Sequence, residues 1–303
     1  MTSRRITVDR VLVALVATVA FWALNVIVVK WAVGDGGQWN PLSYSFLRLC
    51  IGAALLAAFV KVREGSLGIG RRDLPLILVS ALVGICINQL GFMYAATYAT
   101  ATTISLILAT IPAFAAITAS LLGHERIGGR HWLGIGVAAA GTALVLEAGP
   151  GELDLTSLRG DVLALIAAAS WGVYSALVRP LLDRYSPNRV STVVVCAALP
   201  MLAVVSIPQV LAQDYGSVTL GGWSAMLYSV FFSLVVTNVL WFGAIQSGGA
   251  ARATAVLPIQ PFLGALFAFI LLGETVTPMQ IAGGVIVVVG IWLTRRRALV
   301  IES

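Results

Sequence analysis

Five side-chain amides lie inside otherwise apolar stretches of this 303-residue chain: Asn25, Asn88, Gln89, Asn238 and Gln260. Burying an amide in an apolar medium costs free energy unless the group finds a hydrogen-bond partner. Where such stretches cross a bilayer, polar residues in them mark functional sites. An amide offers both a donor and an acceptor, which suits the polar end of a small solute. We therefore predict that these five residues bind substrate.

Five aromatic residues of the apolar stretches are candidates for the same site: Trp22, Tyr94, Trp171, Tyr174 and Trp241. Their rings bury a large apolar area and keep one polar atom for a hydrogen bond. Trp22 and Trp171 lie too deep in their runs for an interfacial belt, so both are candidates to flank one pocket. Packing is the simpler explanation for any single ring. As a group, they predict a substrate site for large apolar or aromatic side chains.

Two related stretches contain helix breakers: "ILATIPAFAAITASLLGHE" at 107–125 and "VLPIQPFLGALFAFILLGE" at 256–274. Pro112, Pro258 and Pro261 each lack a backbone donor, which leaves a carbonyl group without its usual partner. In a membrane span, neighbouring protein or cavity water must satisfy that carbonyl. We expect these prolines to bend their helices beside a substrate cavity and to act in gating. A static kink that fits its neighbours is the alternative.

Charged side chains are nearly absent from the middle of the apolar stretches. No Asp or Glu occurs there, which argues against exchange of a proton for a cationic drug. Glu125 and Glu274 lie at the ends of their runs, where we expect them to bind backbone groups or basic side chains. For Lys30 and Arg48, snorkelling to lipid headgroups is the favoured explanation. If they face a cavity instead, either could pair with a substrate carboxylate.

No set of residues suggests an enzyme. His124 and His131 share one turn without further metal ligands, and neither a phosphate-binding glycine loop nor a Ser/His/Asp set is found. Cys50, Cys86 and Cys196 lie in apolar runs without CxxC spacing, as small hydrophobic residues do. We predict no catalytic residue, no metal and no cofactor.

Composition places the chain in a membrane, with 59% hydrophobic and 11% charged residues and a mean hydropathy of +0.96. Spans in hydrocarbon must satisfy their own backbone hydrogen bonds, and continuous apolar runs favour helices over barrel strands. We predict an all-α integral membrane protein. Its ten transmembrane helices are expected at 11–33, 42–62, 74–94, 100–122, 131–148, 161–180, 190–211, 222–245, 250–272 and 278–294.

The chain repeats itself at an interval of 149 residues. Pairs at this interval are Trp22 and Trp171, Lys30 and Arg179, Pro112 and Pro261, Glu125 and Glu274, and Gly141 and Gly290. Each half, 1–149 or 150–303, holds five expected helices, so the two halves cross the membrane in opposite directions. We predict two five-helix inverted repeats around a central cavity, an architecture that supports alternating access. A duplicated membrane scaffold without transport is the alternative from another class.

Basic residues predict the orientation. Nearly all lie on the same side as the N-terminus, whereas the opposite loops hold only Arg159. By the positive-inside rule, both termini are cytoplasmic. The pI near 9.6 then reflects topology and contact with anionic headgroups of the lipid bilayer, and we predict no nucleic-acid partner.

The two five-helix units resemble the two EamA repeats of the ten-helix drug/metabolite transporter superfamily. The resemblance rests on a proline-bearing fourth helix ending in "LLGHE" or "LLGE", followed by "HWLGIGVAAAGTAL" or "MQIAGGVIVVVGIWL". Within the superfamily, the chain is similar to YddG-type exporters of aromatic amino acids in the bacterial inner membrane. The resemblance implies facilitated export of amino acids. Drugs or other metabolites are the alternative substrates, and fused repeats are compatible with a monomer.

Overall fold

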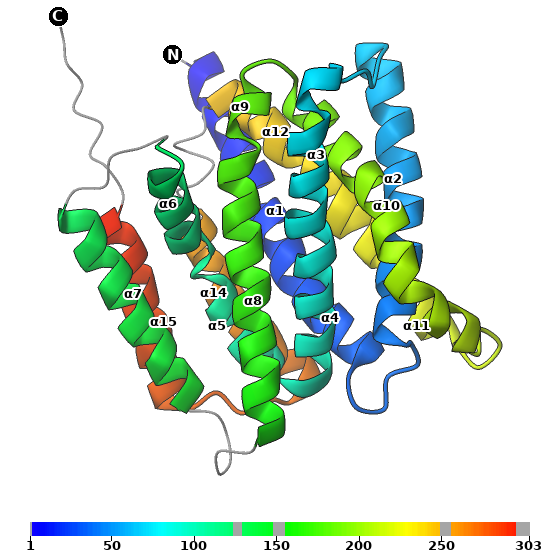
Figure 1. Ribbon diagram of the computed structural model, residues 1–303. Coiled ribbons are helices and arrows are strands. Elements are labelled where there is room, and N and C mark those ends of the chain that lie inside the picture. Colours follow the sequence, from blue (N-terminus) through cyan, green and yellow to red (C-terminus); the bar gives the residue numbers. More distant parts are fainter. Residues whose placement is uncertain (1, 124–128, 148–154, 249–255, 295–303) are drawn as a thin grey trace, which may run out of the picture.

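The computed structural model describes residues 2–123, 129–147, 155–248 and 256–294. Within these ranges the chain forms helices and short connections, without a strand (Figure 1). Seven helical segments are long and apolar enough to cross a membrane, and three shorter apolar ones cover Trp132–Val145, Leu257–Leu272 and Pro278–Leu293. The predicted all-α membrane fold is confirmed, and the ten segments match the ten predicted spans. Residues 250–255 of the ninth predicted span lie outside the described ranges.

The first half contains five membrane-spanning segments, two of which are composite. They are α1 (Thr2–Val33), α2 (Pro41–Glu64), the third segment (3-10 turn Arg71–Asp73, α3 Leu74–Ala81, π-helix η2 Leu82–Ile87 and α4 Asn88–Tyr98), the fourth (α5 Ala101–Leu108 and α6 Ile111–Leu121) and α7 (Gly129–Glu147). We call the side of the bundle on which α1 begins the N-terminal side, and the other the opposite side.

The second half follows the same order. It contains α8 (Leu155–Leu177) with the short α9 (Arg179–Leu182), α10 (Pro187–Ala212), the eighth segment (α11 Leu220–Val230, π-helix η3 Phe231–Val236 and α12 Thr237–Gly248), the ninth (3-10 turn η4 Leu257–Ile259, α14 Gln260–Phe267 and π-helix η5 Ala268–Leu272) and α15 (Pro278–Thr294).

Helix starts follow ordinary capping chemistry. Thr100, Ser186 and Thr219 precede α5, α10 and α11, and each side chain accepts a hydrogen bond from a backbone N–H in the first turn. Pro187 follows its cap at the first helical position, where no backbone donor is needed. The connections are therefore encoded locally even though the helices themselves are uniformly apolar.

The internal repeat extends to irregular features of the backbone. The π-helices η2 and η3 begin at Leu82 and Phe231, and α6 and α14 begin at Ile111 and Gln260, in both cases 149 residues apart. A π-helix adds a residue to a turn and frees backbone groups, and it often occurs at functional sites. The halves therefore share these irregularities, whereas the π-helix η5 has no counterpart at the end of α6.

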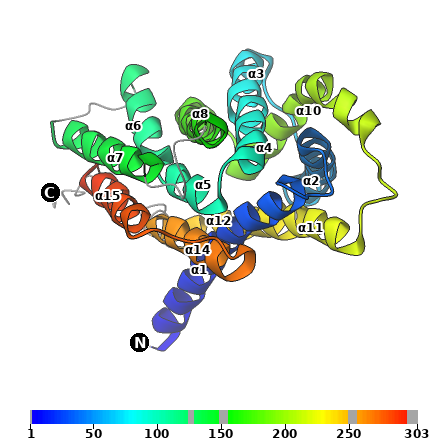
Figure 2. The ribbon, with the colours of Figure 1, turned by 90° about the horizontal axis from the view of Figure 1, so that it is seen from below.

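Helices of the two halves interlock in two layers, which are visible from below (Figure 2). α8 packs against α4 and α6 of the first half, and α1 packs against α12 and α14 of the second half. The first helix of each half thus completes the layer formed by the other half. Two further pairs, α2 with α10 and α7 with α15, join equivalent helices, and α5 with α14 joins the fourth segment to its repeat counterpart, the ninth.

Small residues allow the closest of these crossings. A Cβ atom added at Gly141 on α7 would lie 2.6 Å from Val287 N, and one added at Gly290 on α15 would lie 2.7 Å from Gly134 O. A Cβ atom at Gly264 would likewise collide with Ser105, where α14 crosses α5. The small-residue stripes therefore serve close backbone packing, as is usual in membrane helices.

The three prolines predicted to bend helices lie where helical elements begin, whereas Pro200 and Pro208 lie inside α10. The fourth segment is interrupted between Leu108 and Ile111, and Pro112 follows in the first turn of α6. Pro258 lies in the turn η4, and Pro261 lies in the first turn of α14. The fourth segment is thus broken rather than smoothly bent, because two short helices avoid the backbone donor that proline lacks.

Candidate binding site

A chain of hydrogen bonds joins α2, α4 and α8 in the buried interior. Arg48 Nη2 and Ser45 Oγ donate to Gln89 Oε1, at 2.6 and 3.0 Å. Gln89 Nε2 donates to Asn88 Oδ1 at 3.1 Å, and Asn88 Nδ2 donates to the Ala167 carbonyl oxygen at 2.9 Å. Two predicted binding residues, Asn88 and Gln89, therefore form one network that crosses from the first half to the second.

Arg48 is the cation of this network, and it is buried within the protein. The residue is 5% exposed, and its guanidinium carbon lies 6.0 Å from the Tyr44 ring centre. The Tyr44 hydroxyl in turn contacts Ser229 Oγ at 2.7 Å and donates to the Ala225 carbonyl. The favoured expectation of snorkelling is therefore wrong for Arg48, because the side chain turns inward onto Gln89. Lys30, near the end of α1, is only half-buried.

A second group of predicted residues lies where α1 meets η3 and α12. The rings of Trp22 and Trp241 lie 5.3 Å apart between centres. Trp22 Nε1 donates to the Ser233 carbonyl of the π-helix η3 at 3.3 Å. Asn25 and Asn238 each lie three residues from one of these tryptophans, and the buried Oδ1 atom of each has no hydrogen-bond partner among the described residues. This region thus combines aromatic surface with free hydrogen-bond acceptors.

The other predicted aromatic residues form separate contacts. The rings of Trp171 and Tyr174 lie 5.2 Å apart on α8, and Tyr174 packs on Gly84 of the π-helix η2. Among the described residues, Trp171 makes no ring contact with Trp22. The repeat therefore places each tryptophan on the first helix of its half and against different neighbours. Gln260 is half-buried at the start of α14.

Tyr94 lies toward the opposite side, beside a cavity of about 660 Å³. The cavity is lined by Tyr94, Tyr98, Leu158, Arg159, Val162 and Leu163, between the ends of α4 and α8. Arg159 covers the Tyr98 ring at 4.8 Å, and Gln209 Nε2 of α10 donates to the Tyr94 hydroxyl at 2.8 Å. The predicted amides do not line this cavity.

Glu274 joins the two halves on the opposite side. Its carboxylate accepts hydrogen bonds from Ala101 N at 2.7 Å, from Thr102 N at 2.9 Å and from Thr102 Oγ1 at 2.8 Å. A carboxylate at a helix N-terminus is stabilised by the free amide groups and the helix dipole. The expected backbone-binding role of Glu274 is confirmed, whereas Glu125 lies outside the described residues.

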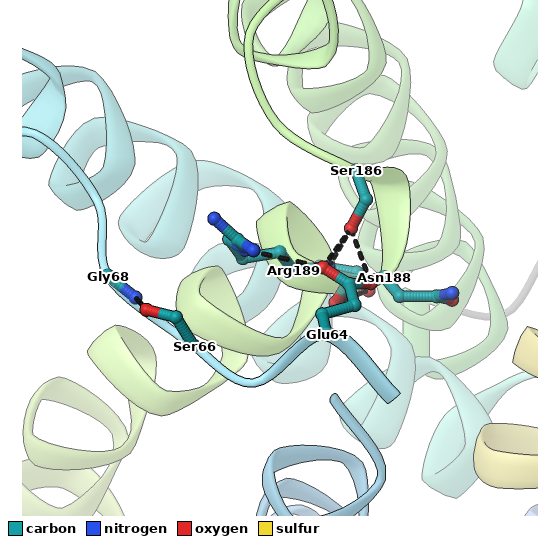
Figure 3. Close-up of polar contacts among 7 residues, drawn as sticks. Glu64, Ser66, Gly68, Ser186, Asn188 and Arg189 are labelled. Carbon is teal, nitrogen blue, oxygen red and sulfur yellow. Dashed lines mark hydrogen bonds and ion pairs between the residues drawn. The ribbon is translucent and has the colours of Figure 1, made fainter. Parts of the chain in front are cut away.

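On the N-terminal side, one ion pair and the hydrogen bonds of a hydroxyl group tie the end of α2 to the start of α10 (Figure 3). Ser186 Oγ donates to both carboxylate oxygens of Glu64, at 2.6 and 2.7 Å, and Arg189 Nε lies 3.3 Å from Glu64 Oε2. Nearby, Asp73 forms an ion pair with Arg184 at 2.6 Å and accepts a hydrogen bond from the Tyr185 hydroxyl at 2.8 Å. We call Glu64, Ser186 and Arg189 the charged clamp.

Sequence reasoning missed several members of these networks. Tyr44, Ser45 and Gln209 were not singled out from the sequence. Hydroxyl groups and side-chain amides are common near helix ends, so these residues gave no distinct signal. Arg48 is recognisable in the sequence as a lone cation within an apolar run. Whether its side chain is buried depends on how α2 is rotated about its axis, which the sequence does not show. In the described part of the chain, no group of three or more His, Cys, Asp or Glu residues is placed to hold a metal ion.

Comparison with known proteins identifies the family. The EamA-like transporter family matches the chain twice, at residues 10–147 and 158–296. A probable terminal-alkyne amino-acid exporter of Streptantibioticus cattleyicolor is 30% identical over 92% of this chain and 94% of its own length. An uncharacterized transporter of Archaeoglobus fulgidus is 23% identical, covering 94% of this chain and 98% of the relative.

A solved crystal structure shares the fold, with a TM-score of 0.64 over 94% of this chain and 96% of the other, at 17% identity. The two family matches and the relative at 30% identity confirm the predicted relationship to the EamA repeats, and with it the prediction that the protein is a transporter rather than an enzyme. The chain belongs to the EamA-like transporter family of the drug/metabolite transporter superfamily and is a multi-pass membrane transporter.

Proposed function

We propose that this transporter exports amino acids with large apolar or aromatic side chains. The observation that carries the proposal is the buried pairing of Arg48 with Gln89, beside helices that hold the Trp22–Trp241 pair and the unpartnered oxygens of Asn25 and Asn238. Fixed polar groups next to aromatic surface suit a solute with a charged end and a large side chain. The name of the relative at 30% identity, a probable amino-acid exporter, supports the same substrate class.

Alternating access is the mechanism that the repeat supports. The halves, 1–149 and 150–303, would exchange conformations so that the site opens first to one side and then to the other. Buried carboxylates in the described residues, Asp73 and Asp161, lie near segment ends, so no acidic group is placed at mid-membrane to carry a proton. We therefore propose facilitated transport in the bacterial inner membrane by a monomer with both termini cytoplasmic.

Counterflow in proteoliposomes tests this function. Vesicles loaded with unlabelled amino acids are given labelled phenylalanine, tryptophan or threonine, with and without a pH gradient. We expect uptake of phenylalanine and tryptophan above threonine, unchanged by the gradient. Trp22→Ala, Asn238→Ala and Trp241→Ala should each lower uptake. Trp132→Ala, which alters an exposed ring on α7, is the matched control. Absence of uptake of every amino acid by folded protein would refute the assignment.

A further inference from the structure

The charge of Arg48 is uncompensated in the interior. A guanidinium group has five N–H donors, and the described structure gives a hydrogen-bond partner to one of its nitrogens only, Nη2. Nε is buried without a partner, and no carboxylate among the described residues forms an ion pair with Arg48. A cation inside a membrane protein is costly unless a counter-charge or a function retains it.

The hydrogen-bond chain holds this cation in a defined place. Gln89 Oε1 accepts from both Arg48 and Ser45, while Gln89 Nε2 is used by Asn88. Asn88 is anchored on the Ala167 carbonyl of α8. Because the amides are committed to one another, the Gln89 oxygen faces the guanidinium group and fixes its position. The remaining donors of Arg48 are left for another acceptor.

The equivalent position in the second half carries no such cation. Adding 149 to the positions of Tyr44, Ser45 and Arg48 gives Val193, Val194 and Ala197, all apolar. These valines and this alanine belong to a hydrophobic cluster around α10. The same helix therefore packs in this fold without a buried arginine, which indicates that Arg48 is retained for binding rather than for packing.

We infer that Arg48 binds the carboxylate of the transported amino acid, with Gln89 as the residue that positions it. This inference rests on the proposed function and names the group that recognises one end of its substrate. A carboxylate accepts two parallel hydrogen bonds from a guanidinium group, and such charge-assisted pairs are strong. The pairing would also neutralise the buried cation. Since Arg48 is closed off here, the carboxylate reaches it when the layers separate during alternating access.

Competition between an amino acid and its carboxamide tests the inference. Uptake of labelled phenylalanine into proteoliposomes is measured with unlabelled phenylalanine or phenylalaninamide as competitor. In the unsubstituted protein, phenylalanine should compete much better than its amide. Arg48→Met should raise the inhibition constant of phenylalanine by roughly 10- to 100-fold, which is the loss of affinity expected when a hydrogen bond to a charged group is removed. The inhibition constant of the amide should stay nearly unchanged. Arg48→Lys should retain part of the preference for the acid over the amide. Lysine keeps the positive charge but lacks the planar guanidinium group that donates two parallel hydrogen bonds.

Controls separate this inference from the proposed function. Arg130→Met removes an exposed arginine that stacks on Trp292, and it should leave the preference intact. If the Met variant is too slow to measure by uptake, ligand-dependent shifts of melting temperature in detergent report the same preference. Uptake of phenylalanine with an equal acid-to-amide preference in Arg48→Met and unsubstituted protein would overturn the role of Arg48 alone. Absence of amino-acid uptake by the unsubstituted protein would overturn the proposed function and this inference together.

Discussion

The two halves of the chain have the same backbone plan but different interior chemistry. Both third segments of the repeat contain a π-helix at the same position, in η2 and in η3. Gln89, which receives Arg48, corresponds to Asn238, whose oxygen has no partner among the described residues. Arg48 itself corresponds to Ala197. The comparison teaches that the repeat fixes the path of the backbone in both halves, whereas the buried polar side chains differ between them.

The same contrast occurs at the two ends of the α2–α10 pair. On the N-terminal side the charged clamp uses Glu64 and Arg189. At the equivalent place on the opposite side, Gln213 accepts a hydrogen bond from Asn40 N at 2.7 Å and donates to the Gln38 carbonyl at 3.0 Å. The positions 64 and 213, and 40 and 189, are each separated by 149 residues. One contact is therefore ionic and its repeat counterpart is neutral.

The largest expected effect comes from placing an arginine in the second half at the position equivalent to Arg48. Ala197→Arg places an arginine within the apolar cluster of α10, and it should destabilise the protein by about 3 kcal/mol, the cost of a charge at the centre of a membrane helix. Arg48→Met removes a charge that lacks a carboxylate partner, so stability should stay equal or increase. Thermal unfolding in detergent measures both. A large loss of stability in Arg48→Met would mean that the network is structural.

An intermediate effect is expected where the halves are equivalent. Gly141→Ala and Gly290→Ala each add a methyl group against backbone atoms of the facing helix. Overpacking of this kind costs about 1–3 kcal/mol, and the two substitutions should cost similar amounts because the crossing is symmetric. Gly136→Ala is the control on the same helix, since a Cβ atom there meets no other atom within 4 Å. Unequal losses of melting temperature at Gly141 and Gly290 would break the equivalence.

The smallest expected effect concerns the charged clamp and its neutral counterpart at Gln213. Glu64→Gln should cost less than about 1 kcal/mol, because the ion pair is partly exposed, and it should reduce the dependence of melting temperature on salt. Gln213→Ala removes neutral hydrogen bonds, so its loss of stability should be the same at about 0.1 M and about 1 M salt. Melting curves at both salt concentrations make the measurement. If the melting temperatures of Glu64→Gln and the unsubstituted protein depend equally on salt, the distinction between the ionic contact and its neutral counterpart is lost.

The interior contacts show how far prediction from sequence reaches. Asn88 and Gln89 were predicted as substrate-binding amides, and the structure joins them in one hydrogen-bond network. Trp22 and Trp171 are candidates to flank one pocket from the sequence, and the structure adds that Trp22 contacts Trp241 and that Trp171 contacts Tyr174. Hydrophobic periodicity could not predict these partners, because helices that are apolar on all sides carry little information about their rotation.

The sequence alone determined the class, the spans and the inverted repeat, because length, hydropathy and an odd number of helices per half are properties of the chain itself. It also located the family pattern around Pro112, Pro261 and Glu274. Only the tertiary structure decided that Arg48 turns onto Gln89 and that the first helix of each half packs into the other layer. These features depend on the direction of each side chain within a packed bundle, which local sequence does not encode.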